Sequence, residues 1–172
     1  ANIDFNTLPD EDFDNPLGES TGAGVIFGVT GGVIEAAVRT AYELFTGNKL
    51  PRIDFKELRG LDGIRMATVD FNGTPINIGI AHQLGNARKL LDGIRSGMYN
   101  FHAIEIMACP GGCIGGGGQP LVKLPAVQKT KEARITGLYN FDAQMKFRSS
   151  YENSEIQEMY KTFLGEPLGE LS

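Results

Sequence analysis

A glycine-rich turn that carries both cysteines of the chain constrains its fold more than any other stretch. Residues 102–107 are typical of a strand, and they lead directly into the sequence C-P-G-G-C-I-G-G-G-G-Q-P at 109–120. Glycine adopts backbone conformations closed to other residues and lets the chain approach a ligand closely. In α/β folds, ligands bind beyond the carboxyl ends of strands. We therefore expect a binding site around Cys109 and Cys113.

Composition narrows the class of protein. The chain has 172 residues, 23 of them glycine, and its 16 basic and 21 acidic side chains give a net charge of −5. This charge argues against a broad surface for nucleic acid or an anionic membrane, and no apolar run is long enough to span a bilayer. We expect one domain over 1–172, with an irregular acidic arm at 1–23. The absence of a signal-like start predicts a cytoplasmic protein, with the periplasm as the alternative.

The hydrophobic pattern predicts strands that alternate with helices. Asn72-Gly73 is a strong hairpin signal between two apolar strands. A helix over 33–45 places Ile34, Val38 and Phe45 on one apolar face. The remaining predicted elements are strands at 64–71, 76–80 and 102–107, a helix at 84–96, and a helical tail at 129–172. The fold class is therefore α/β: a small, twisted, mixed and mostly parallel sheet flanked by helices, with a hairpin and a helical C-terminal tail.

Cysteine chemistry leaves several possibilities open. Two cysteines four positions apart exclude a disulfide framework. Thiolates surrounded by backbone N–H groups suit an iron–sulfur cluster, but the pair supplies only half of a four-cysteine set. Zinc would need His82 and His102 as further ligands, and these are expected at opposite ends of the sheet. A phosphate site at the glycine run matches neither nucleotide-binding template, and the pair could also be two small buried side chains.

Two side chains before the cysteines have alternative interpretations. Met107 lies two residues before Cys109, so in a strand both face the same side. It could pack in the core or contact a metal cluster. Glu105 lies on that face as well, where it would need a partner if buried or could lie at a solvent-facing edge. Phe27, in the apolar run 25–27, is by itself most simply a core residue.

Two segments closely resemble hallmark motifs of the [FeFe]-hydrogenases. Residues 105–120 resemble the third cluster-binding motif of that family, and residues 22–37 resemble a second hallmark segment. The acidic stretch 8–11 and the tail at 151–153 are similar too, so that the resemblance runs over essentially the whole chain. Proteins similar to the nuclear prelamin A recognition factor share a related cysteine motif, and the segment 26–28 with its following helix favours the hydrogenases.

The resemblance implies a catalytic domain of two lobes with the H-cluster between them, and this chain resembles the C-terminal lobe. It implies that Cys109 ligates the [4Fe–4S] part and that Cys113 bridges this cubane to the two-iron subcluster. Met107 would pack against the two-iron unit, and Phe27 and Gly28 would line its pocket. The implied activity is hydrogen oxidation and proton reduction, with ferredoxin or an NAD(P)-linked subunit as the electron partner.

The family motifs T-S-C-C-P and M-P-C-x-x-K-x-x-E do not occur in this sequence. In the family they carry the other two cluster cysteines, the proton-relay cysteine and a lysine. We therefore expect an N-terminal lobe to be a partner of this one, and the isolated chain to lack the cluster and be inactive. The cysteine loop and the face around Phe27 should then be exposed or disordered, or buried in a non-native dimer. The alternatives are a non-enzymatic, hydrogenase-like iron–sulfur or regulatory protein, and a small zinc- or nucleotide-binding α/β module.

Overall fold

The computed structural model describes residues 3–14, 18–48, 50 and 54–171. The chain divides into two compact units, which are described separately. The larger unit is Ser20–Asn153, and the smaller one combines Ala1–Glu19 with Ser154–Ser172. Among the described residues, no helix has both the length and the apolar composition needed to cross a bilayer.

A three-stranded sheet forms the centre of the larger unit. Strands β1 (Ile64–Phe71) and β2 (Thr74–His82) are antiparallel across the predicted Asn72-Gly73 turn, and β2 is parallel to β3 (Ala103–Met107). The mixed sheet and its hairpin are thus confirmed. The prediction of a mostly parallel sheet is wrong, because one of the two strand pairings, the hairpin, is antiparallel.

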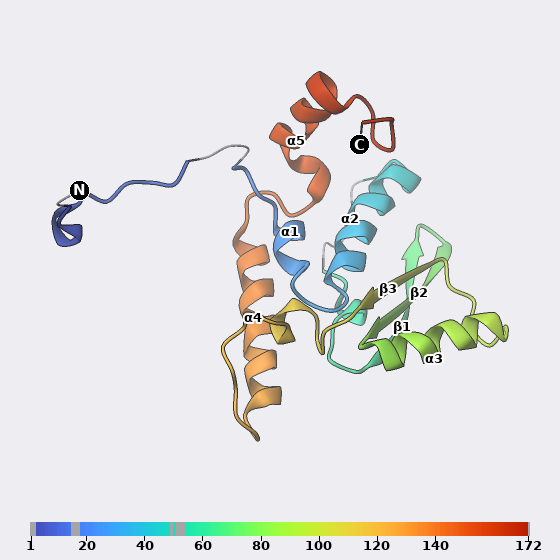
Figure 1. The fold of residues 1–172 in the computed structure, drawn as a ribbon. Helices are drawn as coiled ribbons and strands as arrows, with labels where there is room; N and C mark the ends of the chain where they lie inside the picture. The colour runs from blue at the N-terminus through green and yellow to red at the C-terminus, as the bar shows by residue number, and fades with distance from the viewer. Residues whose placement is uncertain (1–2, 15–17, 49, 51–53, 172) are drawn as a thin grey trace. The chain divides into compact units, whose positions relative to one another are not determined.

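Helix α2 (Gly32–Thr46) packs on one face of the sheet, and α3 (Leu84–Arg95) follows β2 and contacts β2 and β1 (Figure 1). The core between α2 and the sheet contains buried apolar residues from both, including Ile34, Val38, Ile78 and Ile80. The prediction that Phe45 lies in the core is wrong, since 64% of its surface is exposed. The buried side of α2 is rotated from the predicted stripe and includes Glu35 and Arg39, both fully buried.

A second cluster of core residues joins α1 (Gly22–Ile26) to α4 (Val127–Gln144) and to the cysteine loop. Figure 1 shows α1 beside α4, with the loop after β3 leading across to them. Ile26, Ile114 and Tyr139 are buried here. This cluster places the glycine-rich turn against both α1 and α4. The short helices of this unit are η2 (Lys56–Leu58), η3 (Cys113–Gly115) and η4 (Ser150–Glu152).

The smaller unit contains the ends of the chain. It holds η1 (Phe5–Thr7), α5 (Ser154–Met159) and a π-helical turn, η5 (Tyr160–Leu164). Within it, the Glu19 backbone N–H donates to the Glu155 carboxylate at 2.8 Å, and the Ser154 hydroxyl donates to Glu19 at 3.2 Å. Two side-chain contacts thus connect the acidic arm to the beginning of α5.

Candidate functional site

The two cysteines lie in one loop directly after β3. Cys109 is half-buried, Cys113 is exposed, and both thiols are free. The loop turns back on itself through backbone hydrogen bonds that include those from Gly112 N–H to the Cys109 carbonyl at 3.1 Å and from Gly116 N–H to the Cys113 carbonyl at 3.0 Å. The turn therefore holds two soft ligands on a short, internally bonded stretch of backbone.

Glycine is required at the centre of this loop. Gly112 has φ +93°, and a Cβ there would lie 2.7 Å from the Thr30 nitrogen and 3.0 Å from the Met107 sulfur. A Cβ at Gly116 would lie 3.3 Å from the Cys109 sulfur. At these two positions the backbone lies close to the sulfur atoms of Met107 and Cys109, and a larger residue would disturb this approach.

The turn between α1 and α2 lies against the same loop. Gly28 accepts a hydrogen bond at its carbonyl from the Ile114 N–H at 3.1 Å, and Thr30 N–H donates to the Gly111 carbonyl at 3.0 Å. The structure thus brings Gly28 to Cys113. Phe27, next to Gly28, is 45% exposed rather than part of the core.

A cavity of about 350 Å³ opens beside Cys113, between the loop, α1 and α4. Gly28 lines it, as do Val25, Arg134 and Leu138. The sequence predicted the loop and Gly28 for a site but gave no signal for Arg134, because it lies on a polar helix remote in sequence.

Glu105, in β3, connects the strand before the cysteine loop to the beginning of α2. Its carboxylate is buried and accepts hydrogen bonds from the backbone N–H groups of Gly31 and Ile34, the latter at 2.8 Å. These donors belong to the N-terminal end of α2, where a negative charge is favourable. Of the two interpretations of Glu105, the buried one with a partner is confirmed: its hydrogen-bond donors are backbone N–H groups, and its charge also interacts with Arg65.

The histidines lie apart from each other. His82 ends β2 opposite Met107, whereas His102 precedes β3, where its backbone N–H donates to the Asn77 carbonyl. Within the described residues, no group of three or more His, Cys, Asp or Glu side chains is placed to hold a metal ion. The geometry gives no support to a zinc site built from this chain's own histidines and cysteines.

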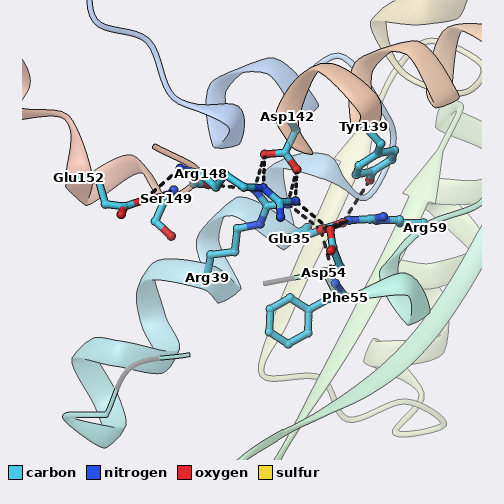
Figure 2. A network of polar contacts seen from close by, with 10 residues as sticks. All are labelled: Glu35, Arg39, Asp54, Phe55, Arg59, Tyr139, Asp142, Arg148, Ser149 and Glu152. Carbon is cyan, nitrogen blue, oxygen red and sulfur yellow. Dashed lines mark hydrogen bonds and ion pairs between the residues drawn. The ribbon is translucent and has the colours of Figure 1, made fainter. Parts of the chain in front are cut away.

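A network of buried charges connects α2 to α4 (Figure 2). Arg39 binds Asp142 through two parallel hydrogen bonds of 2.8 and 2.9 Å, and it also donates to Glu35 at 2.9 Å. All three side chains are fully buried. Burial alone would raise the pKa of Asp142, but hydrogen bonds from Arg39 and Arg148 outweigh it and lower that pKa.

The network extends to the segment that precedes β1. Arg59 donates to Glu35 at 2.6 Å and to Asp54 at 2.8 Å, and Arg148 reaches Asp54 at 2.8 Å. Burial raises the pKa of Asp54, but its two arginine partners outweigh this and bring it to about 2. Tyr139 donates its hydroxyl to Glu35, and burial followed by the charge of Glu35 raises its pKa. No sequence motif pointed to this network, although Glu35 and Arg39 have the (i, i+4) spacing of a helical ion pair.

The donor set fits an iron–sulfur cluster in part. Two thiols without disulfide partners lie on a loop in which glycine keeps the backbone close to sulfur. Thiolate sulfur with hydrogen-bonding backbone nearby is the environment such clusters use. A cluster held by four thiolates would need its other ligands from residues outside this loop.

Comparison with known proteins agrees with this chemistry. Residues 1–117 match the family described as "Iron only hydrogenase large subunit, C-terminal domain", and residues 128–172 match the family described as "Iron hydrogenase small subunit". The chain is similar to the NADP-reducing hydrogenase subunit HndD of Solidesulfovibrio fructosivorans, with 57% identity over 99% of this chain and 29% of the relative. It is also similar to the periplasmic [Fe] hydrogenase large subunit of Nitratidesulfovibrio vulgaris, with 49% identity over 81% and 32%.

Solved structures give the same result. The structure of HydA(deltaEFG), from work on stepwise [FeFe]-hydrogenase H-cluster assembly, aligns with a TM-score of 0.67 and 40% identity over 98% of this chain and 49% of that one. A more distant relative, Protein NAR1 of Arabidopsis thaliana, is 28% identical over 96% of this chain and 35% of the relative. The chain spans about a third of the length of the curated relatives and about half of the solved chain. With two thirds of its length matched by the family model, the chain belongs to the family formed by the C-terminal domain of iron-only hydrogenase large subunits.

Proposed function

We propose that this chain forms one lobe of the catalytic domain of an iron-only hydrogenase, which interconverts dihydrogen with two protons and two electrons. The observation that carries the proposal is the loop of Cys109 and Cys113, held against Gly28 in a chain of this family. The cavity beside Cys113 supports it.

Each residue of the site has a proposed role. Cys109 would ligate the [4Fe–4S] cubane, and Cys113 would bridge the cubane to the two-iron subcluster. Met107 would pack against the two-iron unit, since its sulfur lies at the foot of the loop near Gly112. Phe27 and Gly28 would line the pocket, where an exposed aromatic ring can exclude water from a neighbouring ligand.

The H-cluster, when bound, supplies the redox chemistry of hydrogen. This chain's residues hold it by two thiolates and shape one wall of its pocket. The remaining thiolates and the proton relay would come from an N-terminal lobe, because the sequence holds only two cysteines. The isolated chain is therefore expected to be inactive.

The proposed electron partner is an NAD(P)-linked subunit, or a ferredoxin. The first choice follows from the 57% identity to a protein named as a subunit of an NADP-reducing hydrogenase. We also propose that residues 128–172 are the equivalent of a small subunit, joined in one polypeptide to the domain of the large subunit. For the location we propose the cytoplasm, and a relative named as periplasmic makes the periplasm the alternative.

The alternative function is a non-enzymatic iron–sulfur protein. More distant relatives include a probable cytosolic Fe–S cluster assembly factor of Aedes aegypti, 30% identical over 85% of this chain and 28% of the relative. The higher identity to hydrogenases favours the enzyme.

The test uses the polypeptide that joins this chain to the rest of the catalytic domain, matured anaerobically. Iron content, electron paramagnetic resonance and hydrogen evolution are measured together. Cys113→Ser should abolish hydrogen evolution and reduce bound iron, because serine is a poor bridge between iron atoms. Gly117→Ser is the matched control, since a side chain there meets open space in the same loop.

The outcomes separate the proposals. Iron–sulfur signals without hydrogen evolution in the unsubstituted protein would support the non-enzymatic alternative. Full iron content and activity in Cys113→Ser would contradict the role given to this cysteine.

A further inference from the structure

We propose that Arg134, on α4, is a positioning residue that fixes the Cys113 loop in the conformation from which it binds the cluster. This inference rests on the proposed function of the loop. Arg134 acts through the backbone, because its guanidinium bonds carbonyl groups on both sides of the glycine run.

The contacts of Arg134 span the loop. Its guanidinium donates to the Ile114 carbonyl at 2.7 Å and to the Pro120 carbonyl at 3.1 Å. These two carbonyls lie on either side of the four glycines at 115–118. One rigid, planar group with several donors therefore closes the loop, and such charge-assisted bonds are stronger than neutral ones.

The loop needs an external support because of its composition. Glycine loses more conformational freedom on ordering than any other residue. A Cβ at Gly117 or Gly118 would have no neighbour within 4 Å, so that side-chain packing does not order this part of the loop. Hydrogen bonds must then supply the order: the Gln119 N–H donates to the Gly116 carbonyl at 3.4 Å within the loop, and Arg134 adds bonds from outside it.

Ile114 is the point at which these supports meet. Its N–H donates to the Gly28 carbonyl, its carbonyl accepts from Arg134, and its side chain is buried in the second core cluster. Cys113 is the preceding residue and is itself exposed. The position of its sulfur thus depends on how firmly Ile114 is held.

Arg134 also brings a positive charge to the site. It is half-buried and lines the same cavity as Cys113 and Gly28. A cation beside thiolate ligands favours the more negative, reduced state of a bound cluster. Positioning and charge are separate effects, and a lysine variant distinguishes them.

Helix α4 is suited to carry such a residue because it is fixed independently. Tyr139 and Asp142, further along α4, lie in the buried network with Glu35 and Arg39. A helix held in this way has supports besides its contacts with the loop, and it can present Arg134 in a fixed position.

The first experiment measures amide hydrogen exchange in the metal-free chain. In Arg134→Met, the amides of Ile114 and Gly116 should exchange at least about tenfold faster, since two hydrogen bonds to a charged group are lost. Arg134→Lys should restore part of the protection, because an ammonium group can bond one carbonyl. Lys129→Met, which removes an exposed cation from the same helix, should leave the exchange rates unchanged.

The second experiment measures the cluster in the matured enzyme. Arg134→Met should bind less iron and shift the midpoint potential of the cubane to more negative values. Arg134→Lys should bring the potential back towards that of the unsubstituted enzyme, because the charge is kept. A purely structural role would leave the potential of the remaining cluster unchanged.

The inference and the proposed function can fail separately. Unchanged exchange rates together with an unchanged cluster spectrum in Arg134→Met would overturn the inference and leave the hydrogenase proposal standing. If the unsubstituted enzyme binds no cluster, the proposed function is overturned instead, whatever the exchange rates.

Discussion

At the scale of single residues, the site depends on the absence of a side chain at Gly112. A Cβ at Gly112 would lie 2.7 to 3.0 Å from the Thr30 nitrogen, the Gly28 carbonyl oxygen and the Met107 sulfur. Two of these three neighbours are backbone atoms, which cannot move aside as a flexible side chain can. The constraint therefore acts on the backbone of two segments at once.

Gly112→Ala is predicted to destabilise the fold by about 1–3 kcal/mol, because φ is positive there and the Cβ meets backbone. Urea unfolding of the metal-free chain measures the change in free energy. Gly117→Ala is the matched control in the same loop, with open space and ordinary φ, and should stay within about 0.5 kcal/mol. Equal effects of the two substitutions would contradict the close approach at Gly112.

At the scale of elements, α2 has a polar pair on its buried side. Glu35 and Arg39 are fully buried there, opposite Tyr139 and Asp142 of α4. A buried ion pair adds little net stability, but removing one partner destabilises the fold strongly because the other charge is left buried and unpaired. The network therefore selects the position of α4 relative to α2 by penalising arrangements that leave a charge unpaired.

Arg39→Met is predicted to destabilise the chain by about 3–5 kcal/mol, because Asp142 and Glu35 keep their charge without this partner. Arg95→Met is the control, since Arg95 forms an exposed pair with Asp92 and should change stability by less than about 0.5 kcal/mol. Chemical denaturation gives both values. A loss below about 1 kcal/mol for Arg39→Met, on the scale of an exposed pair, would contradict a structural role for the network.

The same network predicts how stability depends on pH. The pKa of Asp54 falls from 3.8 to about 2 in the folded chain, and that of Asp142 is also lowered. A carboxylate with a lowered pKa stabilises the fold above its unfolded pKa and loses this contribution as pH falls through its folded pKa. The urea midpoint should therefore decrease as the pH falls from about 4 towards 2.

Asp142→Asn is predicted to flatten this dependence, since the amide has no proton to gain. The comparison uses the slope of the unfolding free energy against pH, measured in both proteins. An identical slope in the variant would show that other carboxylates cause the acid sensitivity.

The elements themselves were largely predictable from local pattern. The hairpin signal Asn72-Gly73, the strand before Cys109 and the helix that begins at Gly32 all lie where the sequence predicts them. The buried face of α2 was not predictable in the same way. A hydrophobic stripe predicts the buried face of a helix without reference to the element that packs against it. Here α4 supplies Asp142, which pairs with Arg39, so that Glu35 and Arg39 are buried while Phe45 stays exposed.

At the scale of the whole molecule, the larger unit joins segments that match two different families. The match to the large subunit ends at residue 117, and the match to the small subunit begins at 128. Between them, Leu121 and Leu124 are highly exposed. The network of Arg39 and Asp142 connects the two matched segments across this junction.

A protease site inserted at 121–124 is predicted to allow cleavage without dissociation, because the α2–α4 network and the second core cluster still hold the parts together. Size-exclusion chromatography of the cleaved chain at neutral pH should show both parts in one peak. The same cleavage in Arg39→Met should release a larger fraction of the C-terminal part. Complete separation of the unsubstituted protein after cleavage would contradict a stable interface.

The sequence by itself determined the local features of this protein: a glycine-rich turn with two cysteines after a strand, a hairpin, and the alternation of strands and helices. Each follows from neighbours a few residues apart. Only the tertiary structure decided what the loop rests on. The Glu105 carboxylate beneath the α2 terminus, the charges that dock α4, and the two bonds from Arg134 to the loop join residues far apart in the chain. Such pairings depend on where whole elements pack, because a charge is paired in the interior only by the element that comes to cover it.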